Sequence, residues 1–173
     1  MDLQTFNTLD GDARKAVFLG FCGAHAWADA MVAAGPFADL EALHAAAGRA
    51  FDGLNANDWQ AAFAHHPRIG DRAALEQRFG TSGRHSDREQ AAVATATEDV
   101  LDALLRLNDA YFDRHGHIFI VFATGKTASQ MLALLEARIG RTLDEENATC
   151  AEEQRKITAL RIDRHFGRQA TTT

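Results

Sequence analysis

The chain has 173 residues, a formal net charge of −6 and a sequence pI near 5.7. Its length fits one domain with a single substantial core, so we expect one domain over residues 1–173, with a disordered tail from about residue 167. Arg and Lys are interspersed with Asp and Glu, which argues against nucleic-acid binding, because such surfaces normally concentrate basic residues on one face.

Cysteine content and hydropathy bear on the compartment. The two cysteines, Cys22 and Cys150, form neither a C-x-x-C pair nor a metal-ligand spacing, which is typical of a reduced, cytosol-like compartment. The longest uncharged stretch near the N-terminus, residues 16–28, is too short to span a bilayer. No cleavable signal pattern opens the chain. We therefore expect a cytoplasmic, bacterial protein that has no membrane contact.

Apolar residues return at helical spacing almost throughout, and proline occurs only at Pro36 and Pro67. The pattern predicts an all-α, single-domain bundle of about seven to eight helices. The first two helices are predicted over residues 10–21 and 24–34. Pro36 is expected to open a third helix, and Asn57 to cap a short fourth helix that Pro67 ends.

The second half of the chain is expected to begin with a long helix over residues 86–115. The apolar run 118–123 is too short for its periodicity to distinguish a strand from a helix, so we expect a buried connector. Two further helices are predicted over residues 127–139 and 142–166. In the last helix, three apolar residues are expected to face the core: Ile157, Leu160 and Ile162.

Three polar side chains provide a base, an acid and an anion clamp: His66, Glu89 and Arg161. A titratable imidazole, a carboxylate and a fixed guanidinium suffice to handle a small anionic substrate without a metal or an organic cofactor. Each side chain also has a structural interpretation, which the residue patterns leave open.

Glu89 and Ser86 have the spacing of a capping box, in which two side chains satisfy free amides at a helix start. The same spacing recurs at Thr127 and Thr142, and spacing alone favours the structural role. The neighbourhood favours function, because a helix N-terminus attracts anions and Ser86 and Gln90 add neutral donors there.

His66 precedes a proline at a predicted helix end, where a histidine often caps the last carbonyls or faces water. The same proline restricts the backbone of His66 and holds its imidazole on a stiff corner, which favours a functional role. Arg161 lies among basic residues of a predicted amphipathic helix: Arg155, Lys156 and Arg164. A solvated surface arginine is therefore its structural interpretation.

One partial metal motif occurs in the chain. Glu41-x-x-His44 resembles half of a di-iron carboxylate site. Such a site needs a second Glu-x-x-His pair, and the sequence contains none. We therefore predict that the protein binds no metal.

Five segments, taken together, resemble the 2-oxo-4-hydroxy-4-carboxy-5-ureidoimidazoline (OHCU) decarboxylase family, and the resemblance covers nearly the whole chain. They are His66-Pro67-Arg68-Ile69-Gly70, Ser86-x-x-Glu89-Gln90-Ala91, Leu107-Asn108-x-x-Tyr111, Phe119-Ile120-Val121 and Lys156-Ile157-x-x-Leu160-Arg161. The family performs the last step from urate to (S)-allantoin.

The resemblance implies an all-helical, cofactor-free decarboxylase that acts on a small anionic substrate and is usually a homodimer. It implies His66 and Glu89 as catalytic residues and Arg161 as the substrate anchor. The other implied substrate-binding residues are Pro67, Ser86, Gln90, Phe119, Ile120, Val121, Phe122 and Ala123.

Three positions depart from the family pattern: Ala92 replaces a more frequent glycine, Gly116-His117 replaces Gly-Phe, and Lys126 replaces arginine. These positions bear on the pocket wall and not on His66 or Glu89. Two other functions stay open. One is a non-catalytic helical domain that binds a ligand or a protein on the same scaffold; the other is a metal-dependent hydrolase.

Overall fold

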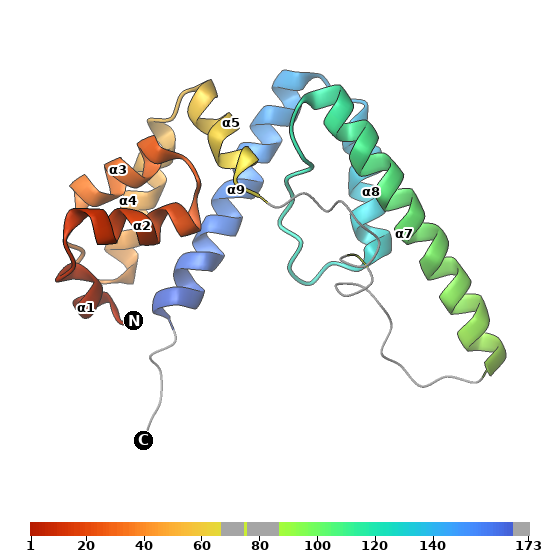
Figure 1. The fold of residues 1–173 in the computed structure, drawn as a ribbon, viewed down its shortest axis with the longest axis horizontal. Helices are drawn as coiled ribbons and strands as arrows, with labels where there is room; N and C mark the ends of the chain where they lie inside the picture. Colours follow the sequence, from red (N-terminus) through yellow and green to blue (C-terminus); the bar gives the residue numbers. More distant parts are fainter. Residues whose placement is uncertain (67–74, 76–86, 168–173) are drawn as a thin grey trace. The chain divides into compact units, whose positions relative to one another are not determined.

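The computed structural model describes residues 1–66, Leu75 and residues 87–167, and for residues 87–97 it describes the backbone alone. Within that part of the chain there are eight α-helices and no strand, which confirms the predicted all-α class (Figure 1). The chain divides into two compact units, Met1–His66 with Thr149–Thr173, and Pro67–Ala148. We describe each unit by itself, and one domain over residues 1–173 stays a prediction.

The first unit contains five helices and most of a sixth. They are α1 (Leu3–Asn7), α2 (Gly11–Phe21), α3 (His25–Ala34), α4 (Leu40–Asp52), α5 (Ala56–Ala64) and α9 (Leu143–Phe166) from Thr149 onward. Helix α3 packs against α2, α4 and α5 (Figure 1). The short helix α1 was not predicted; its start is fixed by Asp2, whose side chain accepts from the Thr5 amide at 2.6 Å.

Two predicted helix starts are wrong by a few residues, and side-chain caps explain both. Helix α4 begins at Leu40 and not at Pro36, because the Asp39 carboxylate accepts from a first-turn amide. Helix α5 is capped by Asn55 and not by Asn57. The backbone N–H of Asn55 donates in turn to the Asp58 carboxylate at 3.0 Å, which completes a capping box.

Aromatic rings form the core of the first unit. The ring of Phe18 is edge-on to four others: Phe6, Phe21, Trp27 and Phe37. Trp27 stacks on Phe51 with ring centroids 5.2 Å apart, and its indole N–H donates to the Ala47 carbonyl at 3.2 Å. Edge-on and stacked pairs each contribute roughly 0.5–1.5 kcal/mol beyond burial. This core fixes α2, which carries one end of the candidate site.

The second unit contains α7 (Asp87–His115), α8 (Ala128–Ile139) and the first residues of α9. Helix α7 packs along α8 (Figure 1). Their shared core consists of Leu75, Leu101, Leu104, Tyr111, Met131 and Leu135. The predicted capping box of Thr127 and Gln130 is present at the start of α8, and Thr142 pairs with Glu145 at the start of α9.

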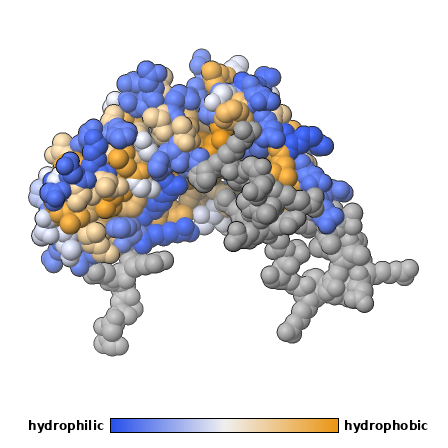
Figure 2. Space-filling model, viewed as in Figure 1, coloured by the Kyte–Doolittle hydropathy of each residue, from blue (hydrophilic) through white to orange (hydrophobic). Residues whose placement is uncertain are grey.

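Most of the described apolar side chains are buried or half-buried. On the face seen in Figure 2, hydrophilic residues cover much of the surface and hydrophobic residues show between them. The large hydrophobic residues that are exposed in the described part are Met1 and Leu143. No described helix combines the length and the apolar character needed to cross a membrane.

Candidate active site

His66 lies directly after the C-cap of α5, and its amide donates to the Phe63 carbonyl at 3.2 Å. Its side chain is half-buried. The imidazole Nε2 is 2.5 Å from Oε1 of Gln154, a fully buried residue of α9. The ring is therefore held by a buried amide, and does not cap the carbonyls of α5.

A continuous path of hydrogen bonds leads from His66 to Arg161 within the first unit. Gln154 Nε2 donates to Thr158 Oγ1 at 3.0 Å, and this hydroxyl donates to the Phe21 carbonyl at 3.3 Å. Arg161 Nη1 donates to the same carbonyl at 2.9 Å. The structure thus brings together the proposed base and the proposed anion anchor through one backbone oxygen.

The end of α2 makes the Phe21 carbonyl available. Cys22 is extended, with φ −143° and ψ 124°, so α2 stops at Phe21. The last carbonyls of a helix lack partners within the helix and carry the negative end of its dipole. A hydroxyl and a guanidinium are suitable donors there, which explains why Thr158 and Arg161 of α9 meet at this atom.

Gly23 allows a close approach beside the same turn. A Cβ atom on Gly23 would lie 2.1 Å from Cβ of His65, the neighbour of His66. Real Cβ atoms do not approach so closely, so any other residue would displace one of the two segments. Glycine at this position therefore lets the α2–α3 turn pack against the corner that holds His66.

The guanidinium of Arg161 has the properties of an anion-binding group. It is half-buried, and burial lowers its pKa, while the nearby Cys22 thiol acts in the opposite direction. Within the described residues no carboxylate pairs with it, and its bond to Phe21 uses one of its donors. Further N–H groups can therefore bind a carboxylate in the two-pronged manner typical of arginine.

The pKa of His66 suits a proton acceptor. Burial lowers it, the hydrogen bond with Gln154 partly opposes this, and the charges of Arg161 and His65 lower it further. The ring is therefore neutral near pH 7, and a neutral imidazole can accept a proton.

The segment 118–123 belongs to the second unit and has no regular secondary structure. Ile120 is buried and the other five residues are half-buried, which fits the expected connector. The carbonyls of alternate residues accept from side chains: Ile118 from His117 Nδ1 at 3.0 Å, Ile120 from Arg138 Nη1 at 3.0 Å and Phe122 from Lys126 Nζ at 2.6 Å. Side chains thus fix this backbone, and no strand in the described part of the chain pairs with it.

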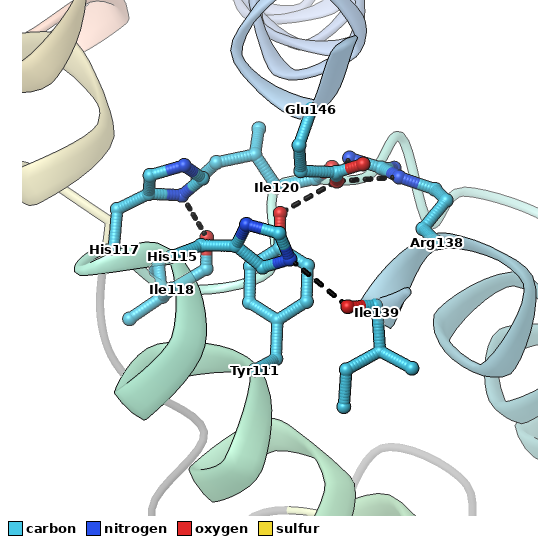
Figure 3. Close-up of polar contacts among 8 residues, drawn as sticks. All are labelled: Tyr111, His115, His117, Ile118, Ile120, Arg138, Ile139 and Glu146. Carbon is cyan, nitrogen blue, oxygen red and sulfur yellow. Dashed lines mark hydrogen bonds and ion pairs between the residues drawn. The ribbon is translucent and has the colours of Figure 1, made fainter. Parts of the chain in front are cut away.

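A buried polar cluster holds one of those donors in place (Figure 3). The Glu146 carboxylate, which is fully buried, accepts from Tyr111 Oη at 2.5 Å and from Arg138 Nε at 2.7 Å. Burial raises the pKa of Glu146, but these hydrogen bonds and the Arg138 charge outweigh it and keep the pKa below its ordinary value. Arg138 thus connects the ionised Glu146 to the carbonyl of Ile120.

Several predicted site residues lie outside the described part. Pro67 and Ser86 are not among the described residues. Glu89 and Gln90 lie in the first turns of α7, but their side chains are outside the description. Their roles stay predictions.

Neither the hollow in the first unit nor a metal site among the described residues coincides with His66 and Arg161. A hollow of about 170 Å³ is lined by residues including His44, Phe51 and Arg155, but by neither His66 nor Arg161. Among the described residues, no group of three or more His, Cys, Asp or Glu could hold a metal ion. His44 of the partial di-iron motif lies 2.7 Å from the Asp163 carboxylate.

A family model described as OHCU decarboxylase matches residues 7–163. The chain belongs to the OHCU decarboxylase family. It is 23% identical over 167 residues to an OHCU decarboxylase of Haloferax volcanii, covering 96% of each chain. It is 33% identical over 149 residues to the uric acid degradation bifunctional protein TTL of Arabidopsis thaliana, covering 86% of this chain but 46% of that protein.

The fold agrees with that of a solved member of the OHCU decarboxylase family. A crystal structure of OHCU decarboxylase in the presence of (S)-allantoin superposes with a TM-score of 0.69. The two chains are 27% identical, and the match covers 87% of this chain and 96% of the other. The helical fold is therefore that of this decarboxylase.

Sequence patterns did not single out Gln154 and Thr158. Both are polar and fully buried, whereas the predicted core residues Ile157 and Leu160 are half-buried; Ile162 is buried as expected. The buried stripe of α9 in this unit advances four residues at a time: Cys150, Gln154, Thr158, Ile162 and Phe166. A search for apolar periodicity passes over such a stripe, because two of its members are polar.

Proposed function

We propose that this chain decarboxylates OHCU and yields (S)-allantoin in urate degradation, without a cofactor. The observation that carries the proposal is a path of hydrogen bonds in a chain of this family. It joins a neutral imidazole, His66, to a guanidinium, Arg161, by way of Gln154, Thr158 and the Phe21 carbonyl. The chain spans 46% of the Arabidopsis relative, and the activity is proposed for this chain alone.

The chemistry needs few groups. The carbon that loses carbon dioxide carries a hydroxyl, and the electron pair of the broken C–C bond moves toward the adjacent ring C=N. This ring takes the place of a Schiff-base cofactor. Arg161 holds the substrate anion, and His66 accepts the hydroxyl proton. Glu89 hydrogen-bonds the ring or ureido nitrogens and orients the substrate.

The product is a single enantiomer if a proton reaches only one face of the resulting enol-like intermediate. Within the proposal, His66 or a water molecule that it orients delivers this proton. Positioned acid–base groups of this kind accelerate reactions by roughly 10²- to 10⁴-fold. The reaction thus combines orientation of the substrate with proton transfer, and the proton transfer needs a fixed imidazole.

We further assign Pro67, Ser86, Gln90 and the segment 118–123 to substrate binding. Within the described residues, no hydrogen bond reaches the backbone groups of Phe119 or Val121, whereas the alternate carbonyls are occupied. This alternation between described residues supports backbone contacts of Phe119 and Val121 with a polar ligand. Lys126, a departure from the family pattern, donates to the segment itself.

The test generates the substrate in place from urate with uricase and hydroxyisourate hydrolase, and follows allantoin by circular dichroism with and without the protein. Rapid appearance of (S)-allantoin that survives a chelator is expected. A racemic product at the uncatalysed rate would contradict the proposal, and thermal stabilisation by the intermediates without turnover would indicate a binding domain. Activity that a chelator abolishes would favour the metal-dependent hydrolase.

Two finer assignments complete the proposal, a dimer from the family resemblance and a compartment from the sequence. We propose that the protein is a homodimer and that it works in a bacterial cytoplasm. Sedimentation equilibrium of the purified full chain would give twice the 18.9 kDa chain mass for a dimer. A single-chain mass at micromolar concentration would contradict that assignment.

A further inference from the structure

Two fully buried polar side chains connect His66 to the end of α2. Gln154 and Thr158 are four residues apart on α9, so both lie on the same face of that helix. Burying an amide costs free energy unless its donors and acceptors are paired. The amide of Gln154 is paired at both ends, with His66 Nε2 and Thr158 Oγ1.

The direction of each hydrogen bond follows from the atom at the far end. The Phe21 carbonyl can only accept, so the Thr158 hydroxyl donates its one hydrogen to it. The hydroxyl oxygen then accepts from the Gln154 NH₂ group, which leaves the amide oxygen facing His66. The reverse orientation of the amide would turn the Thr158 hydrogen away from the Phe21 carbonyl.

An amide oxygen accepts and never donates, so the imidazole must present a hydrogen at Nε2. We propose that Gln154, supported by Thr158 and the Phe21 carbonyl, is a positioning residue that holds His66 with its hydrogen on Nε2 and its lone pair on Nδ1. Nδ1 is then the atom that accepts the substrate proton. This consequence rests on the proposed function, whereas the tautomer itself does not.

The surroundings of His66 are consistent with a fixed tautomer. Burial lowers the pKa of His66, so the ring is neutral near pH 7 and carries one hydrogen. In water a neutral imidazole exchanges this hydrogen between its two nitrogens, and an orienting partner on one nitrogen selects a single form. Gln154 occupies the position of that partner.

The tautomer can be measured without substrate. Long-range ¹H–¹⁵N spectra of the labelled full chain at pH 7.5 distinguish a protonated from a bare ring nitrogen, and a His66→Asn spectrum assigns the signals. We expect a protonated Nε2 and a bare Nδ1. In Gln154→Met, which keeps the side-chain length and removes the acceptor, the two nitrogen shifts should move toward each other. A hydrogen on Nδ1 in the wild type, or an unchanged spectrum in Gln154→Met, would overturn the proposal.

Turnover gives an independent measure. Partners that orient metal-bound histidines typically contribute roughly 10- to 100-fold. By analogy, Gln154→Met should lower kcat by about that factor and change KM little. Gln4→Met, an exposed glutamine, is the matched control and should leave kcat unchanged. A rise in KM without a fall in kcat, or the same kcat in Gln154→Met and Gln4→Met, would contradict a positioning role.

A conservative variant separates positioning from packing. In Gln154→Glu a carboxylate can still accept from Nε2 and should keep the tautomer, while its charge raises the pKa of His66 and moves the acid limb of the pH profile upward. Thr158→Ser should keep activity and Thr158→Val should lose it. If Gln154→Glu leaves the pH profile unchanged and Thr158→Ser loses as much activity as Thr158→Val, these residues act through packing alone and the proposal is refuted.

The two proposals fail separately. If the spectra show the expected tautomer but neither the wild type nor any variant makes (S)-allantoin, the positioning of His66 stands and the proposed function fails. If the wild type makes (S)-allantoin and the hydrogen lies on Nδ1, the function stands and the inference about Gln154 fails.

Discussion

The carbonyl oxygen of Phe21 accepts from both Thr158 and Arg161, so one backbone atom at the end of α2 helps to position two side chains of α9. Arg161 is half-buried at this atom, and the structure does not support the interpretation of it as a solvated surface arginine. The residue itself was predictable from the family pattern. Its partner was not, because a backbone carbonyl leaves no signature in the sequence.

Arg161→Lys should weaken substrate binding. Lysine is a point charge and cannot both donate to Phe21 and grip a carboxylate with two parallel bonds. Loss of one charge-assisted bond is worth about 1.5–3 kcal/mol, so KM should rise by roughly tenfold or more. Arg164→Lys, an exposed position on the same helix, is the control. Steady-state kinetics with the same KM in both variants would remove Arg161 from the anchor role.

Gly23→Ala should destabilise the first unit. The added Cβ would overlap the Cβ of His65, and overpacking of this kind typically costs about 1–3 kcal/mol. Gly20→Ala is the matched control, since a Cβ there meets nothing within 4 Å and lies in α2. Alanine in a helix interior should stabilise by roughly 0.5–1 kcal/mol. If urea denaturation shows that both variants change the free energy of unfolding in the same direction, the close approach of Gly23 to His65 would be contradicted.

Among the elements, long helices were predicted closely and short or capped ones less so. The long helix expected over residues 86–115 is α7 (Asp87–His115), because apolar residues repeat along its whole length. The starts of α4 and α5 were misplaced, since several Asp and Asn residues could have capped them and only the fold selects Asp39 and Asn55. Segment 118–123 was ambiguous because its backbone is fixed by side chains outside it, His117, Lys126 and the more distant Arg138.

Arg138 is the distant donor to this segment, and Arg138→Met should strongly destabilise the second unit. The change would leave the fully buried Glu146 carboxylate without its cationic partner, and breaking a buried pair on one side typically costs about 3–5 kcal/mol. Arg106→Met, an exposed position on α7, is the control. Denaturation midpoints that are equal for the two variants would show that the cluster does not hold the unit together.

Across the whole molecule, the polar groups buried in the two units make stability depend on pH. Burial lowers the pKa of three histidines, His66, His115 and His165. Glu146 has a lowered pKa as well, but for a carboxylate this matters only at more acidic pH. The sequence shows eight histidines, and only the fold reveals which of them are withdrawn from water.

Acidification from pH 7.5 to 5.5 should therefore lower the free energy of unfolding. The unfolded chain binds more protons than the folded chain between the lowered pKa values and the ordinary value of about 6.5, and stability then rises with pH. The contribution is fully present above about pH 6.5 and is lost below it. His66→Asn should reduce this pH dependence, whereas the exposed control His25→Asn should not. Urea midpoints that stay constant between these pH values would contradict the argument.

We propose that His66 and its neighbours give this chain its OHCU decarboxylase activity. The decisive experiment compares the initial rate of (S)-allantoin formation, followed by circular dichroism, for the wild type and for His66→Asn at equal concentrations of folded protein. We expect the wild type to form (S)-allantoin and the variant to be slower by roughly 10²- to 10⁴-fold. Equal rates of (S)-allantoin formation, or a racemic product from the wild type, would contradict it.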